Sequence, residues 1–180
     1  VGVEEAAGSA LVIGGPHPTQ KHVWRVSLAP SGGPSQRLTG EPGVYSASLA
    51  DDGSVFVETS STMTGREAWT IRSWDGARLG ALRSVAERPA FEPRVELVTV
   101  NANGRELHAA VVRPRGFQYG KTYPVIASVY GGPHSQVVTA SRMAYTLQQW
   151  IADHGYIVVS IDGRGTPARG REWERAIKGD

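Results

Sequence analysis

Residues 123–165 constrain the fold more than any other stretch of this chain, because they read as strand, turn, helix and strand. Two mostly apolar runs, 124–130 and 156–162, are rich in valine and isoleucine, which is typical of β-strands. Between them, residues 139–154 have helical spacing and end at Gly155. Two strands joined by a helix of this length predict a βαβ unit, in which the strands are parallel.

Within each apolar run, polar residues hardly alternate with apolar ones, which indicates that both faces of the predicted sheet are buried. Helices must then cover the sheet on both sides, yet the sequence provides one complete helix. We therefore expect the 180 residues to be part of a longer protein. On the predicted helix, the spacing assigns Met143, Ala144, Leu147 and Ile151 to the buried face.

The first 88 residues contain an internal repeat. Residues 11–13 resemble 55–57, which follow 44 positions later, and residues 23–26 resemble 68–71, which follow 45 positions later. A repeat of about 40–50 residues with several short strands is typical of a β-propeller blade, and one blade cannot bury its faces alone. We interpret residues 1–88 as about two blades of an incomplete propeller; an unrelated antiparallel meander is the alternative.

The segment 89–95 contains two prolines and little periodicity, and it is the predicted linker to a second domain, 96–180. In that domain, Asn103-Gly104 lies between two strand-like runs, which predicts a β-hairpin. Near the end, residues 172–178 have the spacing that opens a second helix. The predicted fold class is therefore α/β plus all-β, with propeller blades preceding an α/β domain.

Composition and charge argue against several classes of function. The net charge is only +2 and no basic cluster stands out, which does not favour a nucleic-acid partner. The absence of cysteine excludes disulfides and thiolate chemistry, and no apolar run has the length of a membrane span. His17 and His22 lack an evident third ligand, so no metal site is predicted.

Two turns are candidates for a functional site, because ligands of an open parallel sheet bind beyond the carboxyl ends of its strands. Tyr130 is the last residue of the first apolar run, and Gly131-Gly132 follow it. A tyrosine hydroxyl there can donate a hydrogen bond to a developing oxyanion, and glycines let the backbone approach a ligand closely. Two interpretations of Tyr130 stay open: an oxyanion donor, or the last core aromatic residue of its strand.

The second turn contains Asp162 and Arg164. Both are candidates for contact with a substrate; alternatively, they fix the turn through a charge-assisted hydrogen bond. Arg142, near the start of the predicted helix, is a further candidate that either points into the cleft or lies on the surface. His134 follows the first turn and is interpreted as a loop histidine.

Residues 123–133 read Tyr-Pro-Val-Ile-Ala-Ser-Val-Tyr-Gly-Gly-Pro, and residues 160–173 read Ser-Ile-Asp-Gly-Arg-Gly-Thr-Pro-Ala-Arg-Gly-Arg-Glu-Trp. Both blocks resemble the prolyl oligopeptidase family of serine peptidases, most closely its bacterial dipeptidyl peptidase IV branch. That family joins a propeller to an α/β-hydrolase domain. The resemblance implies that residues 1–88 are the last blades of a β-propeller and that 96–180 are the N-terminal part of an α/β-hydrolase domain.

The resemblance implies a serine-type peptidase that removes dipeptides with a penultimate proline or alanine through an acyl-enzyme. Tyr130 matches the tyrosine whose hydroxyl forms half of the oxyanion hole. The 180 residues contain no Gly-x-Ser-x-Gly elbow, so the Ser-Asp-His triad is expected beyond Asp180 and the chain alone is expected to be inactive. An acylaminoacyl peptidase or esterase of the same fold, or a non-catalytic binding module, are the alternatives.

The resemblance also implies partners and surroundings for the complete protein. It implies a peptide substrate, no cofactor, a homodimer, and a place in the bacterial periplasm or cytoplasm. The dipeptidyl branch of the family holds the free amino group of its substrate with a pair of glutamates on the propeller. Glu4-Glu5 is such a pair but lacks the aromatic context of the family motif, and it is interpreted as solvated.

Overall fold

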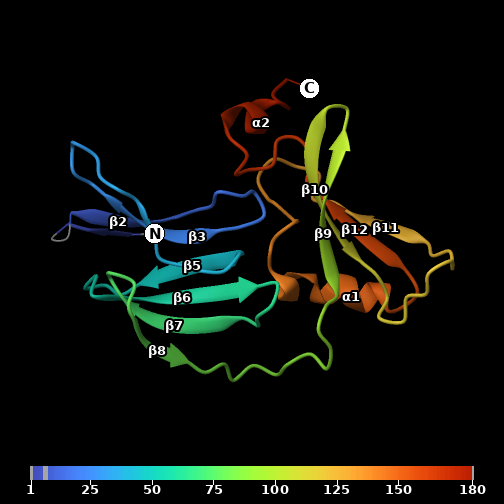
Figure 1. Ribbon diagram of the computed structural model, residues 1–180, viewed down its shortest axis with the longest axis horizontal. Helices are drawn as coiled ribbons and strands as arrows, with labels where there is room; N and C mark the ends of the chain where they lie inside the picture. The colour runs from blue at the N-terminus through green and yellow to red at the C-terminus, as the bar shows by residue number, and fades with distance from the viewer. Residues whose placement is uncertain (1, 6–7, 180) are drawn as a thin grey trace. The chain divides into compact units, whose positions relative to one another are not determined.

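The computed structural model describes residues 2–5 and 8–179, which form two compact units divided between Arg88 and Pro89 (Figure 1). The first unit consists of β-strands and the turns between them. The second unit combines one β-sheet with short helices.

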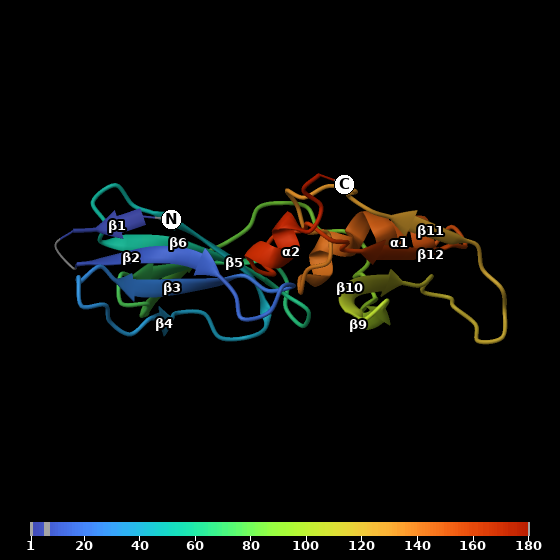
Figure 2. The ribbon, with the colours of Figure 1, turned by 90° about the horizontal axis from the view of Figure 1, so that it is seen from above.

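The first unit contains two antiparallel four-stranded sheets, in which each strand pairs with the next one along the chain. The first sheet consists of β1 (Gly2–Glu4), β2 (Ser9–Gly14), β3 (His22–Ser27) and β4 (Gln36–Arg37), and Figure 2 shows these strands in order. The second sheet consists of β5 (Gly43–Leu49), β6 (Val55–Thr62), β7 (Ala68–Ser73) and β8 (Arg78–Leu82). The repeat in the sequence therefore corresponds to two copies of one four-stranded meander, as expected of propeller blades.

The two sheets share one hydrophobic core. Leu11 and Val23 of the first sheet pack with Tyr45 and Phe56 of the second, and all four side chains are buried. The backbone of Lys21 also bonds to the second sheet, donating to the Gly43 carbonyl at 3.0 Å and accepting from the Tyr45 amide at 2.8 Å. Each sheet thus covers a face that its neighbour would otherwise expose to water.

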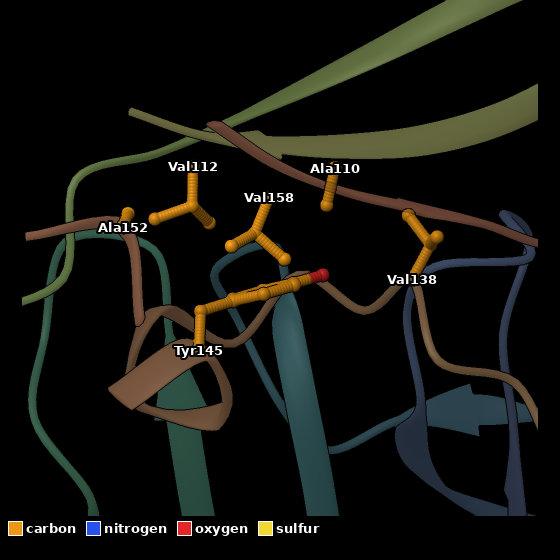
Figure 3. Packing of buried hydrophobic residues seen from close by; sticks show 6 residues of the cluster. All are labelled: Ala110, Val112, Val138, Tyr145, Ala152 and Val158. Carbon is orange, nitrogen blue, oxygen red and sulfur yellow. The ribbon is translucent and has the colours of Figure 1, made fainter. Parts of the chain in front are cut away.

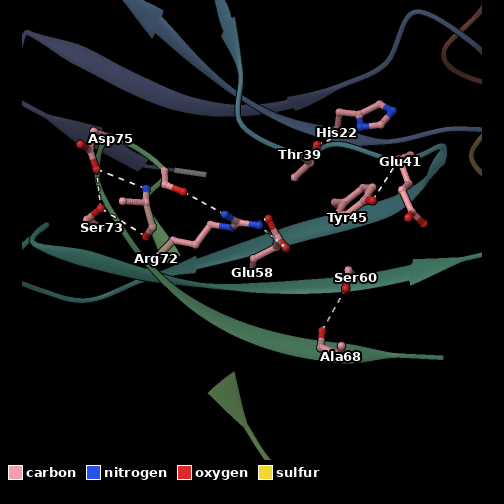
Figure 4. Close-up of polar contacts among 12 residues, drawn as sticks. His22, Thr39, Glu41, Tyr45, Glu58, Ser60, Ala68, Arg72, Ser73 and Asp75 are labelled. Carbon is pink, nitrogen blue, oxygen red and sulfur yellow. Dashed lines mark hydrogen bonds and ion pairs between the residues drawn. The ribbon is translucent and has the colours of Figure 1, made fainter. Parts of the chain in front are cut away.

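A buried histidine lies in this shared core. The Nδ1 atom of His22 is 2.8 Å from the Thr39 hydroxyl, and its Nε2 atom is 3.1 Å from the side-chain oxygen of Gln20. The imidazole stacks on the Tyr45 ring with 5.3 Å between ring centroids (Figure 4). Burial, and then the positive charge of Arg37, lower the pKa of His22, so the core favours the neutral ring.

An ion pair is buried within the second sheet. The Arg72 guanidinium donates to both carboxylate oxygens of Glu58, at 2.7 and 3.2 Å, and to the Gly76 carbonyl at 2.9 Å (Figure 4). Glu58 is only 3% exposed, so removing Arg72 would leave a charged carboxylate in a nearly dry site. A buried charge is tolerated only when it is paired and hydrogen-bonded in this way.

The second unit contains a mixed sheet with the strand order β11-β12-β10-β9. Strands β9 (Val95–Ala102) and β10 (Arg105–Val112) form the expected antiparallel hairpin. Its two turn residues, Asn103 and Gly104, have φ of 51° and 73°, as a type I′ turn requires. Strands β11 (Val125–Ser128) and β12 (Ile157–Ile161) are parallel, as the βαβ prediction required.

Two short helices lie between β11 and β12: the 3-10 helix η1 (Arg142–Tyr145) and the α-helix α1 (Thr146–Ala152). Tyr145 and Ala152 pack against Val112, Val138 and Val158 in the core of this unit (Figure 3). After β12, a turn leads into α2 (Arg171–Arg175), where the sequence predicts a second helix.

The predicted buried face of the helix is only partly correct, because Ile151 packs against the core but Ala144 and Leu147 are exposed. Tyr145, Gln149 and Ala152 are the buried residues, whereas Leu147 is 63% exposed. The helical segment opens with a 3-10 turn, and its inner face includes Gln149 because the amide has long-range partners: it accepts from the Arg94 amide at 2.7 Å and donates to the Arg113 carbonyl at 3.0 Å. Hydrophobic spacing alone does not reveal such a polar anchor.

The expectation that both apolar runs are buried on both faces is met in part by β12 and is wrong for β11. In β12, buried and half-buried residues alternate. In β11, by contrast, exposed and half-buried residues alternate, and Val125 is 62% exposed. The difference arises because β11 is the edge strand of this sheet, whereas β12 lies between β11 and β10.

We expect His22 to make the fold less stable in acid. An unfolded histidine titrates at about 6.5, and folded His22 binds a proton only at lower pH. Between these two pKa values the unfolded state binds more protons, so stability present above about pH 6.5 is lost as the pH falls. Denaturant unfolding between about pH 7.5 and 5 should show this loss, and His22→Gln should flatten it.

Thr39→Val is the matched control for this prediction. It removes the hydroxyl that bonds to Nδ1 of His22 but keeps the titrating ring. The variant should be less stable at every pH while keeping the dependence on pH. If His22→Gln, like Thr39→Val, keeps the pH dependence of the unmodified protein, His22 is not the group responsible for that dependence.

Candidate functional site

The carboxyl ends of β11 and β12 lie side by side, because the two strands are parallel and Ser128 pairs with Ser160. Tyr130 lies two residues beyond β11, and Asp162 directly follows β12. An open pocket of about 170 Å³ lies between these two strand ends. Its walls consist of Val129, Tyr130, Gly131, Gly132, Ile161, Asp162, Gly163, Arg164 and Thr166.

Tyr130 extends from the end of β11 into the wall of this pocket. Its side chain is 50% exposed, and within the described part of the chain its hydroxyl has no hydrogen-bond partner. Gly131 has a φ of 69°, which non-glycine residues rarely adopt. A Cβ atom on Gly132 would lie 3.0 Å from Cε1 of the Tyr130 ring. The two glycines therefore let the backbone turn and pass close to the ring.

Asp162 is buried, with 3% of its surface exposed. Its carboxylate accepts hydrogen bonds from the backbone amides of Val137, at 2.9 Å, and Val138, at 3.1 Å. Burial raises the pKa of Asp162, against the opposing effects of these two amides and of the charges on His108 and Arg169. The carboxylate therefore anchors the connecting loop, which we define as residues 131–141 between Tyr130 and η1.

The same loop has a second anchor next to the first. The Tyr145 hydroxyl accepts a hydrogen bond from the Thr139 amide at 2.9 Å and donates one to the Thr139 carbonyl at 3.0 Å. Between the two anchors, the side chain of Val138 is fully buried and packs near Tyr145 and Val158 (Figure 3). Residues 137–139 are thus fixed to the core of this unit by backbone hydrogen bonds and by packing.

The two candidate arginines differ in their surroundings. Arg164 is exposed and lines the pocket. Arg142 is not among the residues of the pocket wall; its guanidinium lies 3.0 Å from the carboxylate of Glu92. The pocket wall therefore includes Tyr130, Asp162 and Arg164 but not Arg142. Contact of these residues with a substrate stays a prediction.

The remaining candidates of the sequence analysis lie elsewhere. His134 is exposed in the connecting loop, and Nδ1 of His17 is 2.9 Å from the Thr19 hydroxyl. Glu4 is half-buried at the end of β1, and Glu5 is exposed.

Within residues 2–5 and 8–179, no three His, Asp or Glu side chains gather closely enough to hold a metal ion. In the same residues, no helix has the length and apolar character needed to cross a membrane.

Sequence reasoning missed the anchoring of the connecting loop. It named Asp162 and offered the alternative that this residue fixes its own turn, but the amides that Asp162 binds belong to Val137 and Val138, 25 and 24 residues earlier. It also missed Tyr145, whose aromatic ring is a core residue and whose hydroxyl is a loop anchor. No local motif marks these contacts, because they depend on the path of an irregular loop.

The fold and the pocket define a class of protein: blades of a β-propeller followed by the beginning of an α/β-hydrolase domain. Residues 142–180 match the family model described as Prolyl oligopeptidase family. The chain is 32% identical over 172 residues to a probable dipeptidyl-aminopeptidase B of Aspergillus terreus, and 32% identical over 175 residues to that of Tuber melanosporum. Each alignment covers 91% of this chain and 19% of the relative. The chain therefore spans about a fifth of the length of these curated relatives.

Solved structures show the same fold. Dipeptidyl peptidase 4 of Porphyromonas gingivalis matches with a TM-score of 0.81 and 24% identity, over 95% of this chain and 25% of that one. A putative dipeptidyl aminopeptidase IV of Bacteroides ovatus matches with a TM-score of 0.63 and 21% identity, over 94% and 34%. The predicted fold class and the resemblance to the prolyl oligopeptidase family are confirmed.

We expect Gly132→Ala to displace the Tyr130 ring without unfolding the protein. The new methyl group would meet the ring at 3.0 Å, and the half-exposed ring can move toward solvent. The change in the free energy of unfolding should stay within about 0.5 kcal/mol. Gly163→Ala is the matched control in the same pocket, because a Cβ atom there meets no atom within 4 Å. Crystal structures of both variants test this, and an unmoved ring in Gly132→Ala would contradict it.

Proposed function

We propose that the full-length protein is a serine-type peptidase that removes dipeptides from the N-termini of peptides, with proline or alanine as the second residue. The observation that carries this proposal is Tyr130, half exposed beside a glycine turn at the carboxyl edge of two parallel strands. That edge is where ligands bind in open α/β sheets. The dipeptidyl-aminopeptidase relatives and the two structural neighbours support the same assignment.

In the proposed reaction, a serine attacks the peptide carbonyl and negative charge develops on the carbonyl oxygen. The Tyr130 hydroxyl donates a hydrogen bond to this oxygen, and it is available for that purpose because no described residue occupies it. Collapse of the tetrahedral intermediate breaks the C–N bond, releases the amine and leaves an acyl-enzyme, which water then hydrolyses. The 180 residues contain no serine elbow, so the triad of this proposal is supplied by other parts of the full-length protein.

The charged candidates have different parts in the proposal. Arg164 lines the pocket and is exposed, which suits direct contact with a substrate carbonyl. Asp162 belongs to the pocket wall, but its carboxylate oxygens bind backbone amides. Arg142 is paired with Glu92 and is not part of the pocket wall, so it has no assigned contact in the proposal. The homodimer that the resemblance implies is also part of the proposal, and sedimentation of the full-length protein tests it.

Tyr130→Phe in the full-length protein tests the proposed function. The substitution keeps the ring and removes only the hydroxyl, so packing is preserved. Loss of one oxyanion donor should lower the turnover number about 100- to 1000-fold. The Michaelis constant should change little, because the donor acts mainly in the transition state. The measurement is steady-state hydrolysis of a glycyl-prolyl arylamide.

Tyr156→Phe is the matched control, because Tyr156 immediately precedes β12 and so lies at the opposite end of the parallel strands. This variant should keep normal turnover. Both variants should unfold at the temperature of the unmodified protein. Near-normal turnover of Tyr130→Phe would mean that Tyr130 is only an aromatic residue at the end of its strand.

A further inference from the structure

The position of Tyr130 is not set by its own strand. The last residue pair of the β11–β12 ladder is Ser128 with Ser160, so Tyr130 lies beyond the hydrogen-bonded part of β11. After Tyr130 the chain passes through Gly131, where φ is 69°, and glycine allows more backbone conformations than any other residue. The turn that carries Tyr130 therefore needs a fixed point on its far side.

Asp162 supplies this fixed point. Its carboxylate holds the amides of Val137 and Val138, and its own amide donates to the His108 carbonyl at 3.1 Å. One residue thus connects the end of β12, the strand β10 and the connecting loop. The parallel pairing of β11 with β12 holds the chain before Tyr130. The hydrogen bonds of Asp162 hold the chain after Tyr130, at Val137 and Val138.

We propose that Asp162 is a positioning residue that holds the turn of Tyr130 in place by binding the amides of Val137 and Val138. The inference rests on the proposed function, because it assigns to Asp162 an effect on the catalytic role of Tyr130. Asp162 does not contact the substrate in this account. Its influence on the reaction passes through the connecting loop and the Tyr130 hydroxyl.

The chemistry of the contact requires a carboxylate. Two backbone N–H groups point at the two oxygens of Asp162, and an ionised carboxylate presents only acceptors. An asparagine offers one acceptor oxygen and one NH₂ group, which would face an N–H donor. The pKa of Asp162 is raised by burial, so the buried charge does not favour the fold by itself. A role in positioning the connecting loop explains why residue 162 is a carboxylate.

The test is a double-mutant cycle in the full-length protein with Asp162→Asn and Tyr130→Phe. Asp162→Asn alone should lower the turnover number about ten- to a hundredfold, as expected when a catalytic group is misplaced. In the Tyr130→Phe background, the same substitution should lower it less than about twofold, because a residue that acts through Tyr130 has nothing left to position. The loss of stability should be the same in both backgrounds.

Two further variants complete the test. Tyr145→Phe removes the second anchor of the connecting loop, and its effect on the turnover number should be non-additive with that of Tyr130→Phe. This variant tests the inference if Asp162→Asn does not fold. Asp153→Asn is the matched control: its carboxylate accepts from the Arg115 amide at 2.9 Å and from the Gln149 side chain at 3.0 Å, just after α1. That variant should lose stability and keep its turnover number.

The outcomes separate this inference from the proposed function. If Tyr130→Phe retains normal turnover, the proposed role of Tyr130 fails. If Tyr130→Phe is impaired but Asp162→Asn reduces turnover equally in both backgrounds, Asp162 acts independently of Tyr130 and the inference is overturned. Normal turnover of Asp162→Asn and of Tyr145→Phe, with Tyr130→Phe impaired, would also overturn it.

Discussion

The parallel pairing of β11 with β12 is the constraint on which the candidate site depends. Parallel strands bring their carboxyl ends to one edge of the sheet, so residues more than thirty positions apart in sequence line one pocket. Tyr130 enters the pocket from the first strand end, and Asp162 and Arg164 enter it from the second. Neither turn forms a site alone. The ladder between the strands sets their spacing, and the connecting loop sets the direction of the tyrosine.

The first unit follows a different rule, because its sheets depend on each other for burial. The core shared by Leu11, Val23, Tyr45 and Phe56 is contributed equally by both meanders. The shared core also contains the polar side chain of His22, with partners for both ring nitrogens. A polar group in such a core is tolerated because it is hydrogen-bonded. Adjacent propeller blades are expected to join in this way.

Local sequence signals predicted the features that depend on neighbouring residues. Asn103-Gly104 predicted its hairpin because both positions need a positive φ, and the repeat predicted two equivalent meanders. Local sequence signals failed where a long-range polar contact decides which side chain is buried. Gln149 is buried because its side-chain amide forms hydrogen bonds with the backbone of Arg94 and Arg113. The spacing of hydrophobic residues does not predict such a contact. The sequence named Tyr130 and Asp162 as candidates, and both line the pocket, but the amides that Asp162 binds were not foreseen, because an irregular loop brings them there.

The most direct measurement is a crystal structure of the full-length protein with a peptidyl boronic acid, which forms a tetrahedral adduct with a serine nucleophile. The account predicts that the Tyr130 hydroxyl oxygen lies about 2.7–3.1 Å from the adduct oxygen that takes the place of the oxyanion. It also predicts that Asp162 still binds the amides of Val137 and Val138. A Tyr130 hydroxyl turned away from that oxygen, or an Asp162 carboxylate bonded to the ligand instead of the loop, would contradict the account.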